Sequence, residues 1–77
     1  MTVEIITPES TLFEGEASSV QLPGSDGSLG ILDKHAPLIT TLKKGTLRLK
    51  TSGGEQTFEV NGGTVEVNNN RVMILAE

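Results

Sequence analysis

The chain has 77 residues, with ten acidic and six basic side chains, no cysteine and only two aromatic residues. A chain of this length forms one domain, and the lack of cysteine excludes disulfides and thiolate metal sites. The net charge of −4 and the scarcity of aromatic residues argue against nucleic acid as a partner. No apolar run approaches the ~20 residues of a membrane-spanning helix, so the sequence predicts a single soluble domain over residues 1–77.

Apolar and polar residues alternate along most of the chain, which is the pattern of half-buried β-strands. The predicted strands, in chain order, cover residues 2–7, 12–16, 17–22, 29–31, 38–42, 46–51, 56–61, 65–67 and 72–76. Turn-forming residues separate them, most clearly at 8–11, 52–54 and 68–70. No helical period lasts for ten residues. Many short strands at regular spacing predict an all-β fold, a β-sandwich or barrel of about eight to ten strands.

The apolar positions of the alternating segments predict the hydrophobic core. The predicted core residues are Val3, Ile5, Phe13, Val20, Leu22, Ile31, Leu47, Leu49, Phe58, Val60, Val65, Val67, Val72 and Ile74. Gly30 lies between two apolar residues, which suggests a bulge or the close approach of another backbone. Residues 72–76 are apolar at both parities, which predicts a strand that is covered on both sides.

Residues 22–45 contain most of the irregular sequence, including four of the nine glycines, two of the three prolines and the only histidine. Asp26 and Gly27 are a hairpin signal inside a polar loop, because apolar alternation flanks them on both sides. Loops of this kind, set on a rigid scaffold, often carry function.

The strand that follows contains Leu38, Ile39 and Leu42, which cannot all face the same way because successive side chains alternate. Two interpretations remain open from the sequence. Some of these side chains form an exposed protein-contact surface, or the strand is twisted and covered on both faces.

His35 is the one side chain that could act as a base near pH 7, and Asp33, Ser25 and Ser28 lie near it in the sequence. A lone histidine beside a turn more often caps backbone groups or packs at an interface, so we expect no catalytic residue. One histidine, no cysteine and scattered carboxylates likewise predict no metal site and no cofactor.

Two further binding functions are weaker alternatives. Biotinyl and lipoyl carrier domains are also small and all-β, with a lysine at a hairpin tip, and Lys43-Lys44 lies near a turn. The flanking methionines typical of the biotin case are absent there. A phosphate site in the glycine-rich loop is disfavoured because no helix follows it and Asp26 would repel an anion.

Several spaced motifs resemble the N-terminal domain of the epsilon subunit of the rotary ATP synthase. The resemblance covers essentially the whole chain and departs from the family at Asp33-Lys34, where many members carry Pro-Gly. The motifs are Pro8-Glu9-Ser10, Leu12-Phe13-Glu14-Gly15, Pro23-Gly24, Gly30-Ile31-Leu32, His35-Ala36-Pro37-Leu38, Leu42-Lys43-Lys44-Gly45, Gly62-Gly63, Val65-Glu66-Val67 and Val72-Met73-Ile74-Leu75-Ala76.

The resemblance implies a flattened β-sandwich that does no chemistry. It would sit at the foot of the central stalk and bind the gamma subunit and the c-ring, coupling proton transport to ATP synthesis. The family's ring contact would fall on Ser25, Asp26, Gly27 and Ser28. Its gamma contact would fall on Thr7, His35, Ala36, Pro37, Leu38 and Thr40. Asp26 is favoured at the ring, because ring loops in this family commonly offer Arg or Gln.

The resemblance also implies a location. Such a domain meets the membrane only through the complex, at the cytoplasmic face of the bacterial inner membrane or the stromal face of thylakoids. Many epsilon subunits continue into a pair of C-terminal helices that can inhibit ATP hydrolysis and that in some members bind ATP. This sequence stops at Glu77, where those helices would begin, so we expect neither property of this polypeptide.

Overall fold

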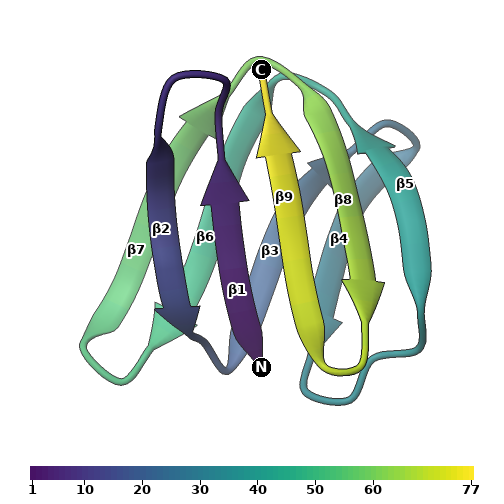
Figure 1. Cartoon of the computed structure of the whole chain (residues 1–77). Helices are drawn as coiled ribbons and strands as arrows, with labels where there is room; N and C mark the ends of the chain where they lie inside the picture. The colour runs from purple at the N-terminus through teal and green to yellow at the C-terminus, as the bar shows by residue number, and fades with distance from the viewer.

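The computed structural model describes all residues from Met1 to Glu77 as nine β-strands without a helix (Figure 1). The strands are β1 (Thr2–Ile6), β2 (Thr11–Glu16), β3 (Ser19–Gly24), β4 (Gly27–Leu32), β5 (Leu38–Leu42), β6 (Gly45–Thr51), β7 (Gly54–Val60), β8 (Gly63–Asn68) and β9 (Arg71–Ala76). There is therefore no helix long and apolar enough to cross a membrane. The predicted all-β class and the predicted number of strands are confirmed.

The strands form two layers that are joined along one side. One layer has the order β2-β1-β9-β8-β5, and the other contains β7, β6, β3 and β4 (Figure 1). The layers connect where β5 meets β3, through the single pair Leu42–Gly24. All neighbouring strands are antiparallel except β1 and β9, which run parallel and bring the two ends of the chain into the same layer. The result is a sheet curled into a sandwich.

The core lies between the layers and consists of sixteen buried apolar residues. Twelve of the fourteen predicted core residues are among them, while Phe13 and Phe58 are only partly buried. Their rings meet edge to face, with centroids 6.1 Å apart, and close the side between the edge strands β2 and β7. Four further residues are buried that the alternation did not predict: Met1, Ala17, Leu42 and Ala76.

Two local expectations were wrong. Gly30 pairs in regular register with Gln21, and a side chain added there would meet nothing within 4 Å, so it marks neither a bulge nor a close approach. β9 is buried on one face only, because Leu75 on the other face is 51% exposed. The apolar residues of β9 that point away from the core therefore form part of the surface.

The turns use the backbone conformations that their sequences favour. Asn69 and Asn70 both have positive φ, 51° and 60°, which gives β8 and β9 a two-residue turn that matches the twist of the strands. Lys34 adopts a left-handed φ of 64° in the connection between β4 and β5. Its backbone N–H donates to Asn70 Oδ1 at 2.7 Å, so the two turns are tied together at the same end of the molecule.

Candidate docking surfaces

The polar loop predicted at residues 25–28 is the tip of the β3–β4 hairpin. Gly24 pairs with Gly27 across it, and Gly27 has the positive φ of 133° that the tight turn requires. The Ser25 N–H donates to the Thr41 carbonyl at 3.0 Å, and the two side-chain hydroxyls lie 2.7 Å apart. These bonds hold the tip against β5. The exposed Asp26 carboxylate forms no ion pair, so the tip presents a free negative charge to solvent.

His35 lies at the other end of β4 and takes part in no catalytic arrangement. Its backbone N–H donates to the Leu32 carbonyl at 3.2 Å, and its ring Nδ1 lies 2.7 Å from the Ala36 carbonyl, to which it donates when protonated. Ser25 precedes β4 and Ser28 is its second residue, so at least four strand steps, about 13 Å, separate both serines from the far end of β4, where His35 lies. The structure therefore does not assemble the triad that the sequence suggested.

Asp33 makes a different contact from the one a triad would need. Its carboxylate accepts a hydrogen bond from the α-ammonium group of Met1 at 2.5 Å, and the same ammonium donates to the Ala17 carbonyl at 3.0 Å. The hydrogen bond and the charge of the ammonium lower the pKa of the Asp33 carboxyl below its usual value. Asp33 therefore anchors the start of β1 to the β4–β5 connection.

The six residues expected at the gamma contact do not form one patch. Leu38 and Thr40 point toward the core side, paired with Val67 and Val65, and line a small hollow beside the tip of the β3–β4 hairpin. His35, Ala36 and Pro37 lie at the start of β5. Thr7 follows β1, where its hydroxyl accepts from the Ser10 N–H in the β1–β2 turn. Strands β9 and β8 lie between β1, which Thr7 follows, and β5, so Thr7 is not next to the start of β5.

The structure exposes an apolar surface of which the sequence indicated only the part on β5, since Ile39 is exposed while Leu42 is buried. We call it the outer stripe: the apolar side chains on the outward face of the layer β2-β1-β9-β8-β5. It consists of Ile6, Leu12, Ile39, Met73 and Leu75. Ile39 is 75% exposed and Leu12 is 40% exposed. The alternation of side chains along β5 indicates that Ile39 faces outward, because its neighbours Leu38 and Thr40 face inward.

Carboxylates accompany the outer stripe. The strand registers place Ile39, Glu66, Met73, Glu4 and Glu14 in one row across β5, β8, β9, β1 and β2. None of these three glutamates has an ion-pair partner within the chain. The face is therefore apolar with free negative charge, and its best partner is an apolar surface that carries basic residues.

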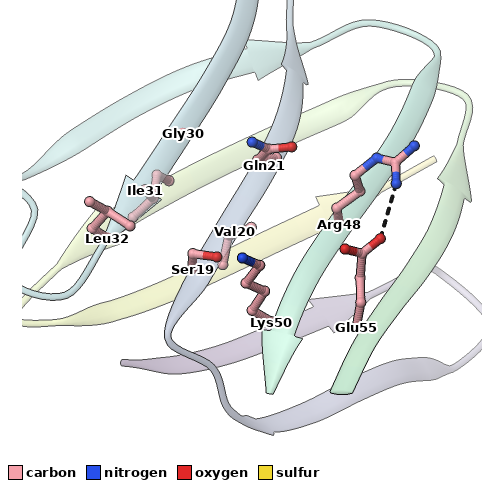
Figure 2. Close-up of a pocket in the computed structure, with 9 residues that line it drawn as sticks. All are labelled: Ser19, Val20, Gln21, Gly30, Ile31, Leu32, Arg48, Lys50 and Glu55. Atoms are coloured by element: carbon pink, nitrogen blue, oxygen red, sulfur yellow. Dashed lines mark hydrogen bonds and ion pairs between the residues drawn. The ribbon is translucent and has the colours of Figure 1, made fainter. Parts of the chain in front are cut away.

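A shallow groove with a volume of about 530 Å³ lies on the opposite layer (Figure 2). It is lined by Ser19, Val20, Gln21, Gly30, Ile31, Leu32, Arg48, Lys50 and Glu55. Figure 2 shows Arg48 reaching toward Glu55, which it meets at 3.0 Å, while the missing side chain of Gly30 leaves the groove open. The molecule buries no polar or charged side chain, so the groove has no desolvated acid, base or nucleophile.

Two other expectations about sites can be compared with the structure. Lys43 and Lys44 lie between β5 and β6, which are not paired with each other, so they do not occupy the tip of a hairpin as a carrier lysine does. No three side chains of the metal-binding types come close enough to hold a metal ion. The fold thus defines a small all-β domain with one polar hairpin tip and one outer face that exposes apolar side chains among carboxylates.

Comparisons with known proteins place this domain in a family. The model of the ATP synthase delta/epsilon chain β-sandwich domain matches residues 1–77. The chain belongs to this family, which confirms the resemblance seen in the sequence.

The relatives agree with this assignment. The ATP synthase epsilon chain of Desulforamulus reducens is 48% identical over 75 residues, which cover 97% of this chain and 57% of the relative. The epsilon chain of Chlorobaculum tepidum is 43% identical and is covered to 88%. The chain thus spans little more than half the length of the first of these relatives.

Two solved assemblies contain the same fold. A chain of the mitochondrial ATP synthase of Euglena gracilis, in a structure described as OSCP, F1 and c-ring, matches with a TM-score of 0.88 and 21% identity, covering 96% of this chain and 48% of the other. A chain from the central stalk and c-ring of the Tetrahymena thermophila mitochondrial ATP synthase matches with a TM-score of 0.83 and 23% identity, covering 99% and 62%. At these identities the likeness concerns the fold.

Proposed function

We propose that this chain is a non-catalytic rotor subunit of the ATP synthase central stalk. In this role it binds the gamma subunit with one surface and the c-ring with another, and so couples proton transport to ATP synthesis. Membership in the epsilon family supports the proposal that the chain is part of the ATP synthase assembly. The observation that carries the docking role is the outer stripe, a group of exposed apolar side chains, accompanied by carboxylates, on one face of the domain.

The outer stripe is the surface that we assign to gamma. Ile39 is the most exposed large apolar residue of the chain and lies on the last strand of its layer. A fully buried side chain of this size contributes about 1.5–3 kcal/mol to an association, so Ile39 has the properties of an anchor residue. This assignment replaces Leu38 and Thr40, which face inward, and moves the centre of the contact toward Ile39 and Leu75.

The tip of the β3–β4 hairpin is the surface that we assign to the c-ring. Ser25, Asp26, Gly27 and Ser28 are all exposed, and Ser25 is bonded to Thr41 so that the loop is already ordered before binding. Pre-ordering lowers the entropy that a contact must overcome. Asp26 contributes about 0.2–1 kcal/mol as an exposed charge, so it helps to orient the contact more than to hold it.

This arrangement places the domain at the membrane only indirectly, through the ring. We propose the cytoplasmic face of a bacterial inner membrane, or the stromal face of a thylakoid, because the ring and the stalk meet on that side in the epsilon family.

Co-elution with the gamma subunit of the same source tests the stalk role. We expect a one-to-one complex that Ile39→Asp disrupts. Leu32→Asp is the matched control, since Leu32 is 66% exposed but lies on the opposite layer. Loss of the complex with Leu32→Asp, but not with Ile39→Asp, would assign gamma to the other face.

Asp26→Lys tests the ring contact in the assembled synthase. We expect weaker proton-coupled ATP synthesis with an unchanged β-sheet circular dichroism spectrum and unchanged co-elution with gamma. Full coupling in this variant would show that the carboxylate at the tip has no part in the contact.

A further inference from the structure

The strand β4 has a free edge that lacks the usual protection against pairing with another strand. The sheet path ends at β2 and β7, and β4 pairs only with β3, so these three strands have open edges. β2 contains Glu14 and Glu16 and a register shift in its pairing, and β7 contains Glu55 and Glu59. β4 reads GSLGIL and has no charge, no proline and no bulge. Charges, prolines and bulges are the devices that keep strand edges apart.

The backbone groups on this edge follow from the hairpin geometry. A two-residue loop closes on a hydrogen-bonded pair, here Gly24–Gly27, and bonded pairs then alternate along the ladder. Ser28, Gly30 and Leu32 therefore direct their N–H and C=O groups away from β3. Of these groups, only the Leu32 carbonyl has a backbone partner outside the ladders, the N–H of His35.

The edge is complementary to itself. When two copies of β4 run antiparallel with Gly30 opposite Gly30, each Ser28 faces a Leu32 and each Leu29 faces an Ile31. The same register brings Asp26 of each copy next to Lys34 of the other, so two opposite-charge pairs flank the uncharged strands. Neither Asp26 nor Lys34 has an ion-pair partner within its own chain. A register shifted by one residue is excluded, because it would set the outward-directed Gly30 against Leu29, whose backbone groups bond to β3.

We propose that the free chain pairs with a second copy of itself through the β4 edges, in the antiparallel register centred on Gly30. The pair extends the layer β7-β6-β3-β4 into one sheet across a two-fold axis and covers Leu32. It also occupies Asp26 and Ser28 at the hairpin tip. The self-paired form is therefore incompatible with any partner that binds this tip.

Sedimentation velocity over a concentration series measures the pairing. The contact is a single strand on each side, so we expect a weak dimer that forms between roughly 10 µM and 1 mM. A sedimentation coefficient that stays at the monomer value up to ~1 mM would overturn the proposal.

Charge reversal locates the contact. We expect Asp26→Lys and Lys34→Asp each to raise the dissociation constant at least threefold, and the double variant to restore the wild-type value. Glu9→Lys is the control for net charge, because it changes the total by the same two units as Asp26→Lys but lies in the β1–β2 turn. If Asp26→Lys and Glu9→Lys both tighten the dimer equally, general repulsion explains the data and the register is wrong.

Amide hydrogen exchange gives a second, independent readout. The Gly30 N–H is expected to exchange fast in dilute solution and at least tenfold more slowly under dimer conditions. The Ile31 N–H, bonded to β3, serves as the control and is protected in both. A Gly30 amide whose rate does not change with concentration would overturn the proposal even if a dimer forms.

Discussion

Gly63 is the position where the fold leaves no room for a side chain, and Gly63→Ala is therefore the sharpest test of the strand pairing. It lies at the start of β8 between Leu42 of β5 and Ala76 of β9. Its φ is +140°, which L-residues rarely adopt, and a Cβ built there would lie 2.1 Å from the Leu75 carbonyl oxygen. Neither the oxygen nor the Ala76 Cα, 3.1 Å away, belongs to a flexible side chain.

The cost can be worked from these two features. A residue held in such a φ region loses about 1–3 kcal/mol, and forcing atoms into a packed site costs another ~1–3 kcal/mol. We expect Gly63→Ala to lower the free energy of unfolding by about 3 kcal/mol or more. A domain of this size is stable by only about 3–5 kcal/mol, so the variant should be largely unfolded or should melt at least ~12 °C lower.

Gly30→Ala is the matched control. Its added Cβ meets nothing within 4 Å and its backbone does not have a positive φ, so we expect no loss and a gain of up to about 0.5 kcal/mol. Urea denaturation followed by circular dichroism measures both variants against the wild type. A loss below about 1 kcal/mol for Gly63→Ala would show that β8 and β9 do not meet as described.

Two further predictions concern the β4–β5 connection. Lys34 is held in a left-handed conformation that costs an L-residue about 1–2 kcal/mol, and Lys34→Gly removes this cost while keeping the conformation. Most of the gain in stability is offset by the greater freedom of glycine in the unfolded chain. We expect a net gain of about 0.5 kcal/mol by urea denaturation, and a loss of stability would indicate that the Lys34 side chain makes an unrecognised contact. Asp33 has a lowered pKa in the folded state, so its contribution is present above the usual carboxyl value of 3.8 and is lost as the pH falls through the lower folded value. In acid titrations followed by urea denaturation, the wild type should lose stability below about pH 4 more steeply than Asp33→Asn, and parallel curves would show that the α-ammonium contact is not formed.

The sequence predicted the strands and the core well because both depend on local alternation. Val3, Leu47 and Ile74 are buried as predicted, since a strict period of two fixes which side chain faces inward once the strand exists. Asn69-Asn70 was found as a turn because asparagine tolerates positive φ. The strand ends differ by at most two residues from the predictions, as expected when only composition marks a boundary.

The sequence could not show in the same way which face of β5 is buried, or which residues form the outer stripe. Alternation shows that Leu38 and Ile39 lie on opposite faces, but not which face is inside. That choice depends on the pairing of Leu38 with Val67, 29 residues away in the chain. The same holds for Leu75, whose exposure follows from the absence of a third layer over β9. Long-range register is invisible in a single sequence.

The order of the contacts along β5 explains how one small domain could serve two partners. Ile39 faces outward in the outer stripe, Thr41 faces outward and holds the hairpin tip through Ser25, and Leu42 between β8 and β3 is buried in the core. The tip is therefore connected to Ile39 of the outer stripe through the Ser25–Thr41 contacts and a single strand, with no loop between them. For a subunit proposed to connect a rotating ring to a shaft, this short path favours rigid coupling.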